Sequence, residues 1–203
     1  KMQNFGLYII ITKPVLPYEE VAEICVKQGI RMLQLREKHL NDRELIKIGK
    51  SIKSITRGSQ TSFVMNDRPD LGVICEADYL HLGQDDMPVE EARKITGDQV
   101  KIGLSTHSIA QAKEALAQKP DYIGFGPIYP TNAKANPDDP VGTENLHKVL
   151  EFADVPVVAI GGIFPENIHN VLQAGAKNVA LVRYFMKTNH LEERIKVMRK
   201  FFY

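Results

Sequence analysis

Residues 157–174 read VVAIGGIFPENIHNVLQA and contain one complete unit of the fold. The apolar run at their start, Val157–Gly162, is short and rich in β-branched residues, which predicts a buried strand ending in two glycines. The segment Pro165–Ala174 follows with apolar residues three and four positions apart, which predicts a helix. This stretch therefore predicts a strand, a glycine turn and a helix, in that order.

Seven other short apolar runs end in small or polar residues in the same way. They are Leu7–Thr12, Met32–Arg36, Ser62–Asn66, Tyr79–Gly83, Lys101–Thr106, Tyr122–Gly126 and Val179–Arg183. Alternating strands and helices are typical of a parallel sheet covered by helices. A closed barrel would gather all eight strand ends around one mouth, where barrel enzymes keep their active sites. We therefore predict an α/β protein with one (β/α)8 TIM-barrel domain over residues 1–203. The alternatives are a doubly wound open sheet and a division into two domains.

Helical segments lie between these runs. They are Tyr18–Gln28, Asn41–Arg57, a short helix from Pro69, Pro88–Ile95, Ser108–Gln118, Thr143–Phe152, Pro165–Ala174 and His190–Phe202. Asn41 with Glu44 three residues later indicates a capping box. Pro127–Gly142 has neither a helical nor a strand period, and loops of this length in compact domains are functional or disordered. We interpret it as a mobile lid that carries Lys134.

Composition limits the class of partner. The 203 residues are 43% hydrophobic and carry a net charge of only +1, so we expect neither nucleic acid nor a membrane as a partner. The longest apolar run, Leu7–Ile11, is too short to span a bilayer. Cys25 and Cys75 have no metal-ligand spacing and are expected to be buried thiols, which, without a recognisable signal peptide, predicts a cytoplasmic protein. Assembly into a homo-oligomer stays open.

Polar residues at the ends of the second to fourth strands suit a bound diphosphate and a metal. Gln34, Arg36 and Lys38 alternate along the chain and so lie on one face. Two cations beside an amide suit a polyanion, although Arg36 could instead join its neighbour Glu37 in closing the barrel rim with ion pairs. Carboxylates from two neighbouring strand ends can converge on one Mg²⁺, which prefers oxygen ligands.

For that metal we single out Asp67 and Asp86, whereas Asp85 is interpreted as a helix N-cap. Gly161 and Gly162 would let the backbone approach a phosphate near a helix N-terminus, although a tight turn also explains them.

The fifth strand ends in Ser105-Thr106-His107. Ser105 suits a hydrogen bond to a heteroaromatic ligand, and His107 could act as a base or cap the next helix. His81 is interpreted as an interior histidine with satisfied hydrogen bonds.

Six motifs together resemble the thiamine phosphate synthase family. They are Gln34–Lys38, Asn66–Arg68, His81–Asp86, Gly103–His107, Asp121–Thr131 with Lys134, and Ala159–Ile163. The resemblance covers most of the chain. It implies a Mg²⁺-dependent transferase that joins hydroxymethylpyrimidine diphosphate to hydroxyethylthiazole phosphate, releasing diphosphate before the thiazole nitrogen attacks. No protein nucleophile is needed for that reaction.

The resemblance also implies a role for each site residue. The pyrimidine diphosphate would be held by Gln34, Arg36, Lys38 and Asn66, with Ser105 on the pyrimidine and Lys134 on the leaving diphosphate. Asp67 and Asp86 would bind Mg²⁺. The thiazole phosphate would be bound by Thr131, Gly161, Gly162, Val182 and Arg183.

Two positions depart from the family pattern. Ala133 stands where a second threonine is usual, and Val182-Arg183 stands where valine and serine usually end the eighth strand. Arg183 could grip a phosphate through two hydrogen bonds or narrow the pocket. One alternative is a thiazole tautomerase of the same superfamily, which uses a histidine where this chain has Pro127. The other is a phosphate-ligand sensor without turnover.

Overall fold

A closed parallel barrel forms the centre of the computed structural model, which describes residues 2–132 and 134–202. Within these residues the eight strands are β1 (Gly6–Ile11), β2 (Met32–Leu35), β3 (Ser62–Asn66), β4 (Tyr79–Leu82), β5 (Lys101–Thr106), β6 (Tyr122–Phe125), β7 (Val157–Ile160) and β8 (Asn178–Leu181). Each strand pairs in parallel with the next, and β8 pairs with β1. The predicted (β/α)8 barrel is thus confirmed, and the open-sheet alternative is wrong because the sheet has no edge.

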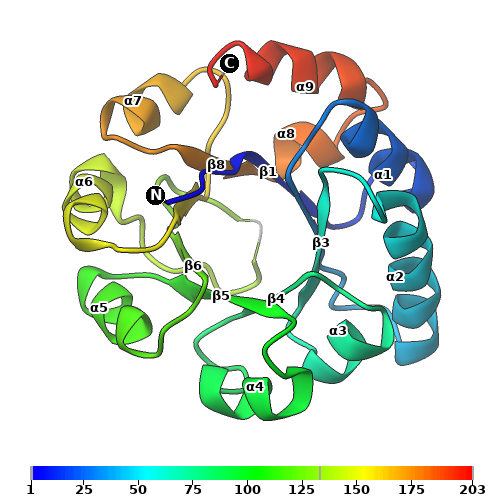
Figure 1. The fold of residues 1–203 in the computed structure, drawn as a ribbon. Coiled ribbons are helices and arrows are strands. Elements are labelled where there is room, and N and C mark those ends of the chain that lie inside the picture. Colours follow the sequence, from blue (N-terminus) through cyan, green and yellow to red (C-terminus); the bar gives the residue numbers. More distant parts are fainter. Residues whose placement is uncertain (1, 133, 203) are drawn as a thin grey trace.

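Helices surround the barrel in a ring (Figure 1). They are α1 (Tyr18–Lys27), α2 (Asp42–Thr56), α3 (Pro69–Ile74), α4 (Val89–Thr96), α5 (Ile109–Ala117), α6 (Gly142–Phe152), α7 (Ile168–Gln173), α8 (Arg183–Met186) and α9 (Leu191–Arg199). Helix α8 was not predicted, because the strand prediction ran two residues too far, to Arg183. In the described part of the chain, no helix is long and apolar enough to cross a membrane.

Local capping explains several boundaries. Asn41 forms the predicted capping box with Glu44, and Ser108 caps α5 by accepting a hydrogen bond from the Gln111 amide at 3.0 Å. Helix α7 begins at Ile168 and not at the predicted Pro165. The side chain of Asn167 explains the difference, because it holds the preceding turn by accepting from the Phe164 amide and donating to the Gly162 carbonyl.

The strands bury side chains on both faces, as parallel strands covered by helices must. One face packs against the helices and contributes residues such as Leu7, Ile9 and Leu33. The other face fills the barrel with Tyr8, Tyr122 and their neighbours. Towards the carboxyl ends of the strands, the inward positions become polar, and the interior opens into a cavity there.

Candidate active site

A cavity of about 890 Å³ lies at the carboxyl ends of the strands. Its lining includes every residue that the sequence singled out for a ligand or a metal: Gln34, Arg36, Lys38, Asn66, Asp67, Asp86, Ser105, Thr131, Lys134, Gly161, Gly162, Val182 and Arg183. Residues far apart in the chain meet here because parallel strands of a barrel present all their carboxyl ends at one mouth. The barrel thus brings the whole predicted set together.

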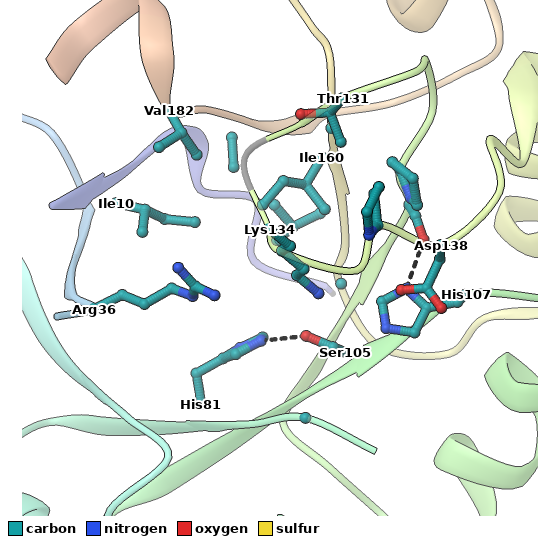
Figure 2. A pocket seen from close by; sticks show the side chains of 18 of the residues that line it. Ile10, Arg36, His81, Ser105, His107, Thr131, Lys134, Asp138, Ile160 and Val182 are labelled. Atoms are coloured by element: carbon teal, nitrogen blue, oxygen red, sulfur yellow. Dashed lines mark hydrogen bonds and ion pairs between the residues drawn. The ribbon is translucent and has the colours of Figure 1, made fainter. Parts of the chain in front are cut away.

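Cations converge in this cavity. Arg36 and Lys134 extend into the same space from opposite sides, above His81 and Ser105 (Figure 2). Partial desolvation at the cavity mouth lowers the pKa of Lys134; Asp138 opposes this effect, and the positive charges of Arg36 and Lys38 add to it. Clustered positive charge of this kind is unfavourable in the free protein and is relieved when an anion binds.

Asp67 and Asp86 face each other beside these cations. Burial raises the pKa of Asp67, and the neighbouring Asp86 raises it further, whereas Lys38, with its Nζ 3.3 Å from the Asp67 carboxylate, lowers it. Asp67 has a positive φ of 64°, an uncommon conformation outside glycine. The Gly83 amide holds Asp86 by donating to its carboxylate at 2.6 Å. Two carboxylates are thus kept close against their mutual repulsion.

Three of the alternative interpretations are now decided. Glu37 is buried and accepts hydrogen bonds from the Lys13 amide and the Tyr18 hydroxyl, so Glu37 closes the rim while Arg36 lines the cavity. The interpretation of Asp85 as an N-cap is wrong, because Pro88 precedes α4 and Asp85 lines the cavity.

His107 does not cap α5 either, since Ser108 does. Its Nδ1 lies 2.7 Å from the Gly126 carbonyl and 3.4 Å from the Asp138 carboxylate, which ties the long loop to β5. His81 is the satisfied interior histidine that was predicted, with hydrogen bonds from both ring nitrogens.

Gly161 and Gly162 are required by packing. Both have positive φ, 104° and 64°, and a Cβ on Gly161 would lie 2.4 Å from the Pro127 Cα. The start of the long loop lies against them, with the Tyr129 amide donating to the Gly161 carbonyl at 3.0 Å. A structural reason therefore accounts for both glycines, and their phosphate role stays a prediction.

The loop from Pro127 to Val141 has no helix or strand among its described residues, as predicted. Its base is closed by hydrogen bonds from the amides of Val141 and Gly142 to the carbonyls of Pro127 and Ile128. Arg183, which could grip a phosphate or narrow the pocket, donates a hydrogen bond to the Asn132 side chain at 2.9 Å, and both roles stay predictions. Ala133, the second departure from the family pattern, lies outside the described residues.

The sequence analysis missed several lining residues. Tyr8 and Tyr122 reach the cavity from inside the barrel, and Gln84 and Asp138 reach it from loops. The two tyrosines could have been found once the strand register was known. They occupy inward-facing positions of their strands, as Gln34, His81 and Ser105 do. For the loop residues the sequence contained no comparable signal.

Fold and site together define a class: a (β/α)8 barrel with cations and a carboxylate pair at the mouth where barrel enzymes keep their active sites. The comparisons with known proteins name the family within that class. The family model described as thiamine monophosphate synthase matches residues 7–185. The chain belongs to this family.

Named relatives agree. Thiamine-phosphate synthase of Lawsonia intracellularis is 41% identical over 181 residues, which cover 89% of this chain and 83% of that protein. The enzyme of the same name from Clostridium novyi is 34% identical, covering 96% and 97% of the two chains. Among solved structures, thiamine phosphate pyrophosphorylase from Pyrococcus furiosus superposes with a TM-score of 0.87 at 34% identity, covering 97% of this chain and 94% of that one. These findings support neither the tautomerase nor the sensor.

Proposed function

We propose that this chain is a thiamine phosphate synthase, a transferase of thiamine biosynthesis that acts by a dissociative displacement. The bond between the pyrimidine methylene carbon and the diphosphate oxygen breaks first, and the electron pair leaves with diphosphate. The thiazole nitrogen then attacks the methylene carbon and forms thiamine phosphate. The observation that carries this proposal is the single cavity in which three cations, a carboxylate pair and a hydroxyl face one another.

The residues at the ends of β2 and β3 would hold the pyrimidine diphosphate. Arg36 and Lys38 would bind its phosphate oxygens, with Asn66 beside them and Gln34 on the ring. Lys134 would stabilise the charge that develops on the departing diphosphate, as cations placed at a leaving group do. Its lowered pKa supports a site that is prepared for an anion. Catalysis would rest on orientation and electrostatics, with no covalent step on the protein.

Asp67 and Asp86 would hold Mg²⁺. The residues fit this ion: two carboxylates lie beside each other, and burial together with the neighbouring Asp86 raises the pKa of Asp67, a cost that a bound cation would relieve. No group of three or more histidine, cysteine or acidic side chains could hold a metal among residues 2–132 and 134–202. A pair suits an ion that is usually bound by one or two carboxylates plus phosphate and water. When bound, Mg²⁺ would neutralise charge on the diphosphate.

The thiazole phosphate would lie on the opposite side of the cavity, near Gly161, Gly162 and Val182. Thr131 and Arg183 would contact it from the loop and from α8. The long loop would act as a lid. Backbone hydrogen bonds to Pro127 and Ile128 close its base, and beyond the base Asp138 and Asn132 hold it through side-chain contacts that can open. A cytoplasmic location is also part of the proposal, supported by two free, buried cysteines.

A direct activity assay tests this function. Purified protein is given both substrates, and thiamine phosphate is measured by chromatography with added Mg²⁺ or with EDTA. We expect product only with Mg²⁺, and restored turnover when excess Mg²⁺ is returned. Product formation that is indifferent to EDTA would contradict the metal assignment, and no product under any condition would contradict the function.

A further inference from the structure

A chain of four short hydrogen bonds crosses the barrel beneath the cavity. The Gln34 amide nitrogen lies 2.9 Å from the Tyr8 hydroxyl, which lies 2.6 Å from the Tyr122 hydroxyl. The Tyr122 hydroxyl lies 2.7 Å from His81 Nδ1, and His81 Nε2 lies 2.6 Å from Ser105 Oγ. Both ends of the chain, Gln34 and Ser105, line the cavity. Its three middle members belong to none of the roles described above.

Counting protons gives the chain of hydrogen bonds a direction. Each hydroxyl has one proton to donate, and a neutral imidazole has one N–H. The Tyr8 and Tyr122 hydroxyls are buried, and a buried proton needs an acceptor. Tyr8 accepts from Gln34, so its proton goes to its other partner, Tyr122, and the Tyr122 proton then goes to His81 Nδ1. His81 must then carry its proton on Nε2 and donate it to Ser105.

His81 is held neutral, as this counting requires. Burial lowers its pKa to about 4, and the positive charge of Lys134 lowers it further, opposed by Asp86. Arg36 and His107 also face this ring and lower the pKa. At neutral pH the imidazole therefore has one N–H and one acceptor nitrogen.

The packing around Tyr122 is built to allow these contacts. A Cβ on Gly103, the neighbouring inward position on β5, would lie 2.1 Å from the Tyr122 Cζ. Only glycine leaves room for the tyrosine ring there. The Tyr122 ring also stacks on the His81 ring, with centroids 5.6 Å apart and planes at 27°. The hydroxyl thus reaches Tyr8 and His81 together.

We propose that Tyr8, Tyr122 and His81 are positioning residues that set the direction of hydrogen bonding at both ends of this chain. The Ser105 hydroxyl, which accepts from His81, turns its own proton into the cavity. The Gln34 amide, which donates to Tyr8, leaves its carbonyl oxygen to accept. A donor and an acceptor on opposite sides match a heteroaromatic ring that has an amino group on one edge and a ring nitrogen on the opposite edge. The inference rests on the proposed function only for the identity of that ligand.

The tautomer of His81 is the direct test. We would record two-bond ¹H–¹⁵N spectra of the whole protein labelled with ¹⁵N-histidine, and assign His81 by the loss of its signals in His81→Gln. We expect the wild-type ring in the Nε2–H tautomer alone. In Tyr122→Phe, which removes the donor to Nδ1 and offers no acceptor in its place, we expect the ring to stay in the Nε2–H tautomer and the Nδ1 signal to move to the position of a ring nitrogen without a hydrogen bond.

Tyr79→Phe is the matched control. Tyr79 belongs to the same interior cluster, with its ring 5.9 Å from that of Tyr122, but it is not a member of the hydrogen-bond chain. We expect its spectrum to match the wild type. If Tyr122→Phe does not fold, Tyr8→Phe is used instead; it leaves the Tyr122 hydroxyl donating to His81 Nδ1, so the ring should stay in the Nε2–H tautomer. A wild-type Nδ1–H tautomer, an Nδ1–H tautomer in Tyr8→Phe, or an unshifted Nδ1 signal in folded Tyr122→Phe overturns the proposal.

Kinetics separate this proposal from the proposed function. In Tyr122→Phe the KM for the pyrimidine diphosphate should rise about five- to tenfold, the effect of one weakened hydrogen bond, while the KM for the thiazole phosphate stays unchanged. Equal changes in the KM values for the two substrates would contradict the positioning role. Because the spectra are recorded on the free protein, a wild-type protein without turnover would contradict the function and leave the tautomer result valid.

Discussion

The two halves of the cavity differ in what holds their polar groups. Around β2 to β5 these groups lie on strand ends or within a few residues of them, and hydrogen bonds fix Ser105 and Asp86 in place. Around β6 to β8 they lie on the long loop and on α8, where Arg183 holds Asn132. Groups on regular elements are positioned more accurately than groups on loops.

This difference matches the order of events in the proposed reaction. The departure of diphosphate would need a metal, cations and an oriented ring in fixed positions, and the strand-end half contains the residues proposed for these roles except Lys134, which the long loop carries. Binding of the second substrate and release of products need an opening, which a loop held beyond its base by the side-chain contacts of Asp138 and Asn132 can provide. The following variants test this division, from the largest expected effect to the smallest.

Asp67→Asn should cause the largest loss. Asparagine keeps the size of the side chain and tolerates the positive φ of 64°, but it removes the charge that would bind Mg²⁺. We expect kcat/KM for the pyrimidine diphosphate to fall by about 10³-fold, roughly 4 kcal/mol of transition-state stabilisation. Initial rates at several Mg²⁺ concentrations measure it. Asp70→Asn is the control, because Asp70 pairs with Arg68 outside the cavity. Equal losses in both variants would contradict the metal role.

Lys134→Met should cost about 10²-fold in kcat, since it keeps the length of the side chain and removes one cation near the leaving group. The KM for the pyrimidine diphosphate should change less. Single-turnover measurements with both substrates saturating isolate this step. Lys148→Met is matched to it, because Lys148 lies on α6 in an exposed pair with Glu144. A rise in KM with unchanged kcat would restrict Lys134 to substrate binding.

Acidification should destabilise the strand-end half through His81. Its pKa is about 4 in the folded protein against an ordinary value of 6.5, so between these values the unfolded chain binds a proton that the folded protein does not. The stabilisation is complete above pH 6.5 and is lost progressively as the pH falls towards 4. Between pH 7 and pH 5 it amounts to about 2 kcal/mol.

Urea denaturation at both pH values gives the change in unfolding free energy between pH 7 and pH 5 for wild type and for His81→Gln. The difference between these two changes measures the contribution of His81. His39→Gln, at an exposed position, should show the same change in unfolding free energy as the wild type. An identical change in unfolding free energy in wild type and His81→Gln would show that His81 titrates normally in the folded protein.

Arg183→Ser should have the smallest effect. The guanidinium is exposed and bound to Asn132, so its removal should raise the KM for the thiazole phosphate no more than about fivefold, with kcat unchanged. Asn132→Ala, which frees the arginine, should leave that KM the same or lower it. A sharp increase in activity in Arg183→Ser would instead identify the arginine as an obstruction.

Much of this molecule could be predicted from local patterns. Short apolar runs and amphipathic segments in alternation are enough for a barrel, because each pattern reports which face of its own element is buried. Element ends were less accurate, as at Pro165 and Arg183. There the boundary depends on contacts such as those of Asn167, which join residues that no periodicity relates.

The sequence by itself determined the fold class, the family and a set of candidate ligand and metal residues, all of which line the cavity. Strand ends carry their own signature, since a buried strand has no structural need for charged residues at one end. Only the tertiary structure decided what each polar group faces. Glu37 faces the rim, Arg183 faces the long loop, and His81 contacts both Tyr122 and Ser105. Hydrogen bonds between strands depend on register and on the space that residues such as Gly103 leave, and both arise only when the barrel closes.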